Sequence, residues 1–292
     1  MALLDQKQLE SISPFFATRA GRVTSGLLKK ALSLDDFISC YEASAEGGVT
    51  GPDFAHNVCV NTGADYQVAG LENLKGFADR PFITISNHPY GGMDGIILVD
   101  TIGHFRPDYK VIVNKFIAIL EAISCNFITV VPTGKTRTSA NAQSIQGIKT
   151  MLSRLSEGHP VGMFPAGAVS NLKPWHGLHD RPWQEAMIKV IRRAGVPVIP
   201  IRFFDGNSKF FYRLGLVSRT LRIMRLPKEV INKRGKQLRL AIGKPIPAER
   251  LNEFPSVEEL GDYLRGVVYG MALPGSFTPR DEITDELKRI MI

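Results

Sequence analysis

The sequence predicts an α/β fold: a mixed, largely parallel sheet flanked by helices, with an N-terminal helical arm. Three short apolar runs rich in β-branched residues, at 82–86, 160–164 and 196–201, have the length and composition of buried strands. Each run is followed by a loop, and stretches with helical spacing separate the runs, as in sheets whose strands are mostly parallel. Because the carboxyl ends of parallel strands meet at one edge of a sheet, we expect a site where the three loops meet.

Other segments extend this pattern. Further strands are expected at 109–113 and 127–132. Helices are expected at about 114–123, 141–157, 184–194 and 256–271, because their apolar residues recur every three or four positions. We expect three parts: an N-terminal helical arm (1–60), one α/β domain (61–272) and a C-terminal surface tail (273–292).

Composition limits the class of protein. At 292 residues, with 44% hydrophobic and 22% charged residues, the chain suits one large globular domain with appended helices. Cys40, Cys59 and Cys125 lie far apart, which fits a reducing cytosol without a disulfide framework. The N-terminus lacks the pattern of a secretory signal, and the most apolar stretch, 116–132, is shorter than a membrane-spanning helix.

Basic residues are concentrated in one part of the chain. Between Arg202 and Lys244, twelve Lys and Arg residues accompany only two acidic residues, a local net charge of +10 in a chain whose total is +8. Such a block suits lipid headgroups, an acidic carrier protein or nucleic acid. Zinc-finger spacing and aromatic RNA-binding motifs are absent from the sequence, which argues against nucleic acid.

The middle of this block has helical spacing. Its apolar residues are Leu214, Val217, Leu221 and Met224, and its interleaved arginines are Arg213, Arg219, Arg222 and Arg225. One interpretation is a stripe of core residues beside solvated arginines. The other is a basic helix whose four arginines contact an anionic membrane or a carrier.

The N-terminal arm allows the same two interpretations. Phe15 and Phe16, beside Arg19 and Arg22, suit a membrane surface. They equally suit a helical arm that packs on its own domain.

The turn after the first apolar run carries the clearest chemical pattern. Proline at 89 removes a backbone donor and keeps His88 out of helical geometry, just beyond a strand. Gly91 and Gly92 then form a flexible turn before Asp94, which we expect to be a helix N-cap and to stay ionised there. On one continuous helix His88 and Asp94 would lie about 120° apart, so the glycine turn is what would bring them together.

An imidazole with a carboxylate that fixes its tautomer suits a general base. The alternative is a turn with a surface histidine and a capping aspartate.

A second cluster of polar residues follows the second run. His176, His179 and Asp180 have spacing that a metal site could use, but no third ligand follows at a recognisable distance, so we expect no metal. Asp180 and Trp183 are interpreted as a structural clasp before the helix at 184–194.

Three segments together resemble the motif blocks of the glycerolipid acyltransferase superfamily: NHPYGGMDG (87–95), FPAGAVS (164–170) and VPVIPI (196–201). The likeness covers about residues 68–250 and is greatest to the bacterial hemolysin-like branch, which includes lyso-ornithine-lipid and lyso-glycine-lipid acyltransferases. Five residues separate His88 from Asp94, where most of the superfamily has four, and five are expected in that branch. The resemblance implies the superfamily's fold and transfer of a fatty acyl group from a thioester to the hydroxyl of a lyso-lipid.

The resemblance also implies roles for individual residues. His88 would take the proton of the attacking hydroxyl, and Asp94 would orient the imidazole and stabilise its charged form. An acyl-enzyme is not required, because no serine lies in a G-x-S-x-G elbow. Amides of the Gly91–Gly92 turn or the Gly167–Ala168 loop would hold the oxyanion. The expected substrate-binding residues are Asn87, Gly91, Gly92, Phe164, Pro165, Gly167 and Ser170.

The expected partners follow from the same resemblance. The donor would be an acyl-carrier protein or acyl-CoA, and the acceptor a lyso-lipid used in membrane lipid synthesis. The protein would be peripheral or monotopic at an anionic surface, the cytoplasmic face of the inner membrane. We expect no cofactor and no nucleic acid.

The second block departs from the superfamily pattern. Glycerol-phosphate enzymes have roughly FPEGTRS there, with an arginine that pairs with the acceptor phosphate, whereas this chain has Val169. Ala166 and Val169 are normal for the hemolysin-like branch, but Ala168 replaces its glutamate. The missing arginine favours an acceptor without that phosphate, such as a lyso-amino-acid lipid.

Two other functions stay open at this point. One is a lipid- or carrier-binding relative without catalytic activity, for which the loss of glutamate at 168 would be the reason. The other is a hydrolase of lipid esters, although the sequence lacks a nucleophile elbow.

Overall fold

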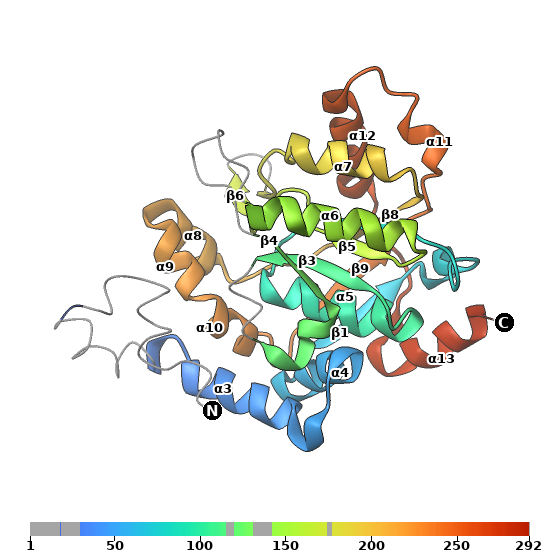
Figure 1. Ribbon diagram of the computed structural model, residues 1–292. Coiled ribbons are helices and arrows are strands. Elements are labelled where there is room, and N and C mark those ends of the chain that lie inside the picture. The colour runs from blue at the N-terminus through green and yellow to red at the C-terminus, as the bar shows by residue number, and fades with distance from the viewer. Residues whose placement is uncertain (1–17, 19–29, 115–119, 131–141, 174–176, 292) are drawn as a thin grey trace.

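A computed structural model describes residues 18, 30–114, 120–130, 142–173 and 177–291 of the chain. Its centre is an eight-stranded mixed sheet with helices on both faces (Figure 1). The strand order is β10-β1-β9-β8-β2-β5-β3-β4. The strands are β1 Asp65–Ala69, β2 Ile83–Ser86, β3 Lys110–Asn114, β4 Phe127–Val130, β5 Val161–Met163, β8 Val198–Phe203, β9 Gln237–Ile242 and β10 Thr278–Pro279. The predicted fold class is confirmed.

The three apolar runs form the middle of this sheet. β2 lies between β5 and β8 and is parallel to both, with Ile85 opposite Met163 on one side and Pro200 on the other. The loops that follow these strands therefore leave the sheet at the same edge, as expected.

Two helical layers bury the two faces of the sheet. On one face lie α4 (Gly51–Thr62), α5 (Gly92–Phe105) and α13 (Arg280–Met291), and on the other lie α6 (Ala142–Ser156), α7 (Glu185–Ala194) and α12 (Val257–Gly270). Ile83 and Ile85 alternate along β2 and pack with the second layer. In α5 nearly every residue is buried, which makes it the central helix of the first layer.

Segments near both ends of the described chain belong to this core. β10 pairs antiparallel with β1, and Ile283 and Leu287 of α13 are buried in the α5 layer. At the other end, Phe54 and Cys59 of α4 are fully buried in the same layer. The structure therefore places 273–291 in the domain rather than in a surface tail, and α4 in the domain rather than in an arm.

Other elements were not predicted, or differ from their prediction. β9 is parallel to β1 but antiparallel to β8, so β1 and β9 both run opposite to the central strands and the sheet is mixed. The helical spacing at 213–225 does not form one helix: α8 (Lys209–Val217) stops before Ser218, whose hydroxyl caps α9 (Arg219–Met224). In place of a helix at 114–123, the described part has the 3₁₀ helix Glu121–Asn126, and 115–119 lie outside the described residues. The remaining elements are α3 Leu34–Ser44, α10 Leu226–Ile231, α11 Ala248–Leu251, the hairpin of β6 Asn171–Lys173 and β7 Gly177–His179, and the 3₁₀ helices Glu46–Gly48 and Leu71–Leu74.

Within the described residues, no helix combines the length and the apolar character needed to cross a bilayer. Phe15, Phe16, Arg19 and Arg22, on which the interpretation of the N-terminal arm depends, lie outside those residues.

A charged cluster joins α4 to α5. Asp100 of α5 is buried, and His104, one turn later, places its Nδ1 3.2 Å from Asp100 Oδ1. The other ring nitrogen of His104 lies 3.1 Å from Oδ1 of Asp53 in α4. The hydrogen bond to Asp100 raises the pKa of His104 from 6.5 to about 9, although partial burial opposes this shift.

We predict that His104→Gln lowers stability in a pH-dependent way. Folded His104 keeps its proton up to about pH 9, whereas an unfolded histidine loses it near 6.5. The stabilisation is therefore complete below about pH 6.5 and is lost as pH rises through about 9. Melting temperatures of both proteins, measured across this range, should differ most at acidic pH and converge at alkaline pH. A difference in melting temperature that does not change with pH would contradict a stabilising role for protonated His104.

Candidate active site

The turn after β2 has a conformation that only glycine adopts readily. Gly91 has φ 80° and ψ −119°, the geometry of the first central residue of a type II′ turn. A Cβ at this position would also lie 2.8 Å from Leu226 Cδ2 and 3.3 Å from Val169 Cγ2. The chain therefore reverses tightly at Gly91, and α5 begins at the next residue.

This reversal brings His88 and Asp94 together. His88 Nδ1 lies 2.7 Å from Asp94 Oδ2, and the Asp94 side chain is fully buried. The two atoms therefore lie within hydrogen-bonding distance of each other. Nδ1 is itself buried while 14% of the His88 side chain is exposed, so Nε2 is the ring nitrogen left for a substrate.

Asp94 is not the N-cap that the sequence suggests. Gly91 is the N-cap, and Asp94 is the third helical residue, from which its carboxylate reaches back over the turn. It accepts hydrogen bonds from the amides of Tyr90 (3.0 Å) and Gly91 (2.9 Å). Burial raises the pKa of Asp94, and His88 and the two amides oppose this rise.

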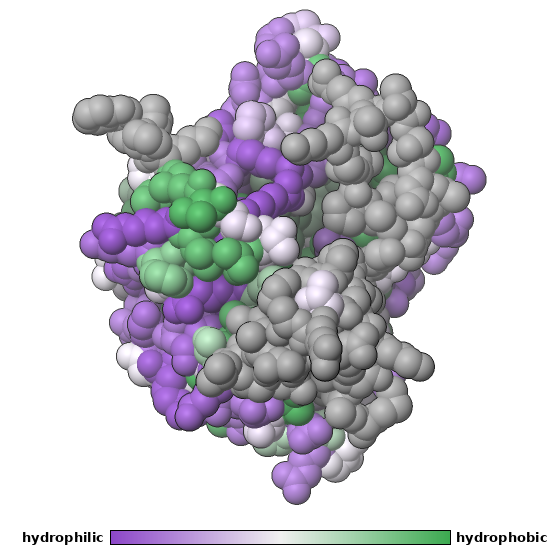
Figure 2. Space-filling model, turned by 90° about the vertical axis from the view of Figure 1, so that its left-hand side faces the viewer, coloured by the Kyte–Doolittle hydropathy of each residue, from purple (hydrophilic) through white to green (hydrophobic). Residues whose placement is uncertain are grey.

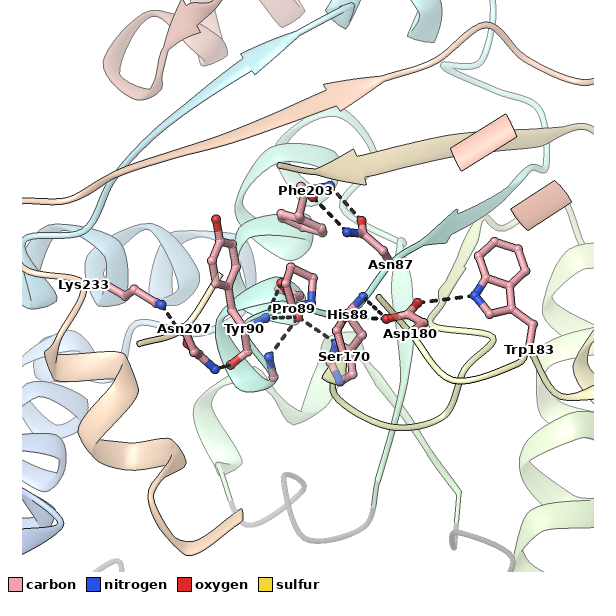
Figure 3. Close-up of polar contacts among 12 residues, drawn as sticks. Asn87, His88, Pro89, Tyr90, Ser170, Asp180, Trp183, Phe203, Asn207 and Lys233 are labelled. Atoms are coloured by element: carbon pink, nitrogen blue, oxygen red, sulfur yellow. Dashed lines mark hydrogen bonds and ion pairs between the residues drawn. The ribbon is translucent and has the colours of Figure 1, made fainter. Parts of the chain in front are cut away.

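The backbone of His88 is fixed on both sides by the second block. Its amide donates to Asp180 Oδ1 at 3.3 Å, and its carbonyl accepts from the amide of Ser170 at 2.8 Å. The Ser170 hydroxyl donates to the same Asp180 oxygen, which closes a ring of three residues (Figure 3). The position of the imidazole thus depends on a carboxylate 92 residues away in sequence.

Asp180 is fully buried, and it connects the His88 turn to Trp183 and to α12. Its second oxygen accepts from Trp183 Nε1 at 3.3 Å, on the side away from His88 (Figure 3). Its amide donates to the hydroxyl of Tyr269, and its carbonyl accepts from Arg265, both residues of α12. The clasp expected from Asp180 and Trp183 therefore also holds the histidine.

The loop after β5 borders the imidazole. The Phe164 ring stacks on His88 with centroids 4.1 Å apart. The carbonyl of Ala166 accepts from Arg181 Nε at 2.6 Å and from Gln184 at 3.3 Å, which holds the loop against the following segment. The Gly167 amide donates to the carbonyl of Phe164, and the Gly91 amide donates to the carboxylate of Asp94. These two amides are therefore occupied and are not available as oxyanion donors.

The loop after β8 supports the turn from the other side. Asn87 exchanges two hydrogen bonds of 2.8 Å with the backbone of Phe203 (Figure 3). Asn207 donates to the carbonyl of Tyr90, and its own side-chain oxygen accepts from Lys233. Burial lowers the pKa of Lys233 to about 8.

Not every predicted substrate contact faces a substrate. Asn87 and Ser170 are buried and bonded to protein groups, so the structure makes them supports of the turn rather than contacts. Gly91 and Pro165 are buried as well. Gly92, Phe164 and Gly167 keep exposed surface, and of these three Phe164 stacks on His88.

Two of the four predicted surface arginines are turned inward. Arg222 is buried, bonds the carbonyl of Ser170 and the side chain of Asn171, and has a pKa lowered by burial. Arg225 forms an ion pair of 3.0 Å with the buried Glu229. Arg213 and Arg219 are exposed, as expected.

The expected absence of a metal site can be examined only in part. His179 stacks on Tyr269 while Asp180 faces His88, so the two adjacent residues point to different partners. His176 lies outside the described residues, and the rest of the described chain contains no group of three metal-ligating side chains.

Sequence reasoning did not identify three supports of the site: Tyr269, Arg265 and Leu226. All three are distant in sequence from His88 and have no motif that connects them to it. They reach the site only because α10 and α12 pack near the two motif loops in the folded chain.

An acyltransferase family model matches residues 28–273. Lyso-glycine lipid O-acyltransferases of Phocaeicola vulgatus and Bacteroides thetaiotaomicron are each 28% identical over 75% of this chain, covering 77% and 79% of their own lengths. The crystal structure of the 1-acyl-sn-glycerophosphate acyltransferase PlsC from Thermotoga maritima aligns over 81% of this chain and 78% of its own, with 18% identity and a TM-score of 0.47.

We predict that Asp180→Ala destabilises the protein strongly. The change leaves three donors, a buried one on Ser170 and partly buried ones on His88 and Trp183, without their acceptor, at about 1–3 kcal/mol each. A loss of about 3 kcal/mol would lower the melting temperature by roughly 6–12 °C. Asp262→Asn, at an exposed position of α12, is the control and should leave the melting temperature unchanged. Equal melting temperatures for Asp180→Ala and wild type would contradict this role.

Proposed function

The chain belongs to the acyltransferase family, and from this premise we propose that it transfers a fatty acyl group from a thioester to the hydroxyl of a lyso-lipid. The observation that carries the proposal is the imidazole of His88, 2.7 Å from a buried carboxylate at the edge of the sheet. A histidine held in this way removes a proton from a hydroxyl, which is a poor nucleophile near neutral pH.

The proposed reaction needs no acyl-enzyme. His88 Nε2 takes the proton of the acceptor hydroxyl while the oxygen attacks the thioester carbonyl. Asp94 holds the proton of Nδ1 and stabilises the imidazolium. As the tetrahedral intermediate collapses, the C–O bond stays, the C–S bond breaks, and His88 returns the proton to the leaving thiolate.

The oxyanion would be held by backbone amides next to His88. The amides of Gly91 and Gly167 are already occupied, so we assign this role to Gly92 and Ala168. Gly92 is the first residue of α5, whose first-turn amides have no partner within the helix. The positive end of the helix would add to the stabilisation of negative charge there.

We propose an acceptor whose headgroup has no phosphate at the second block. Val169, at the position of the phosphate-pairing arginine of glycerol-phosphate enzymes, packs beside Gly91 instead. The two relatives named above act on lyso-glycine lipid, which fits this absence of charge. A lyso-amino-acid lipid, of the glycine or ornithine type, is the acceptor class that we infer, with acyl-carrier protein or acyl-CoA as donor. The reaction would take place at the cytoplasmic face of a bacterial membrane, with the protein peripheral or monotopic there.

The test is an acyl-transfer assay with purified protein. Acyl thioesters of carrier protein and of coenzyme A are offered with lyso-glycine lipid, lyso-ornithine lipid and lysophosphatidate. We expect product with the lyso-amino-acid lipids, and a decrease on the order of 10²–10⁴-fold for His88→Ala and Asp94→Asn, because the first change removes the base and the second removes the carboxylate that orients it.

A second His–Asp pair provides the matched control. His159 Nδ1 lies 2.6 Å from Asp108 Oδ2, but His159 precedes β5 and therefore lies at the opposite edge of the sheet. His159→Ala should keep wild-type activity. Equal product from wild type and His88→Ala would refute the mechanism, and hydrolysis of lipid esters without transfer would indicate a hydrolase instead.

A further inference from the structure

An apolar surface lies on the α8–α9 hairpin, residues 209–224. Ten large hydrophobic side chains are exposed in the described part of the chain, and five of them lie on this hairpin: Phe210, Leu216, Val217, Leu221 and Ile223. Figure 2 shows an apolar patch among hydrophilic residues on the face of the molecule where Figure 1 places α8 and α9. Because a group of apolar side chains on a surface marks an interaction site, this patch indicates that the hairpin binds a partner.

The most exposed of these side chains lie at the tip of the hairpin. Leu216 and Val217 are 76% and 83% exposed at the end of α8, just before the break at Ser218. The tip is therefore aliphatic where a turn on a soluble surface is normally polar.

The charge around the tip has one sign. From residue 206 to 228 the sequence contains no Asp or Glu. Lys209, Arg213 and Arg219 are exposed on the hairpin, whereas Arg222 and Arg225 are turned inward. An aliphatic tip with exposed cations beside it suits an interface between hydrocarbon and anionic headgroups.

The hairpin is attached directly to the loops around His88. The Tyr212 hydroxyl of α8 donates to the carbonyl of Pro89 at 2.8 Å. The guanidinium of Arg222 in α9 bonds the carbonyl of Ser170. A surface that docks here therefore lies next to the proposed catalytic centre.

We infer that the α8–α9 hairpin docks on an anionic lipid bilayer, with Leu216 and Val217 entering the interface and Arg213 and Arg219 contacting headgroups. This inference rests on the proposed function, because a lyso-lipid acceptor resides in a membrane. An acidic carrier protein would also attract the arginines. The two aliphatic side chains at the tip favour the bilayer, because its hydrocarbon region buries them more fully than a strongly acidic protein surface would.

Vesicle flotation tests this inference independently of catalysis. The protein is mixed with vesicles of phosphatidylcholine alone or with phosphatidylglycerol added. Leu216→Ser combined with Val217→Ser should weaken binding to both vesicles on the order of tenfold. Arg213→Gln combined with Arg219→Gln should weaken binding on the order of tenfold to the anionic vesicles only. Leu273→Ser removes a side chain that is 52% exposed elsewhere and should bind as wild type.

The outcomes separate this inference from the proposed function. Wild-type binding by both double variants would overturn the docking surface, whether or not the protein transfers acyl groups. If both double variants bind vesicles as wild type does, but transfer the acyl group more slowly only from the carrier-protein thioester, the surface binds the carrier instead. Weaker vesicle binding by both double variants supports the bilayer even if the transfer assay gives no product.

Discussion

The rest of the structure depends on a close contact between an imidazole and a buried carboxylate. His88 and Asp94 lie six positions apart and would point in different directions on a regular helix. They meet only because the chain reverses at Gly91 with a positive φ and then starts α5 at once. A carboxylate enclosed in this way is costly unless it is paired, and His88 together with two amides supplies the pairing.

Three strands and one distant carboxylate keep this contact in place. Asn87 ties the turn to β8, Ser170 ties it to the loop after β5, and Asp180 accepts from both His88 and Ser170. The α8–α9 hairpin lies against the same loops through Tyr212 and Arg222. The groups that would meet the membrane and the groups that would carry out transfer are therefore parts of one connected support, which suits an enzyme whose acceptor resides in a bilayer.

The local sequence predicted the central strands, from the composition of the apolar runs, and the meeting of His88 with Asp94, from the glycine turn, because both are local features. It did not predict that β9 runs antiparallel to β8, that α13 packs in the core, or that Arg222 is buried. Each depends on a partner far away in sequence. The break at Ser218 was missed for another reason: a hydroxyl that caps a new helix interrupts a spacing that otherwise continues across it.

The tautomer of His88 is the most direct measure of the central claim. In ¹⁵N-histidine-labelled protein, long-range ¹H–¹⁵N spectra at neutral pH report which ring nitrogen is protonated. The six histidines are distinguished by the signal that disappears in His88→Gln. If Asp94 holds the ring, His88 carries its proton on Nδ1 and leaves Nε2 bare, and Asp94→Asn removes that preference. A proton on Nε2, or the same tautomer in both proteins, would contradict the account.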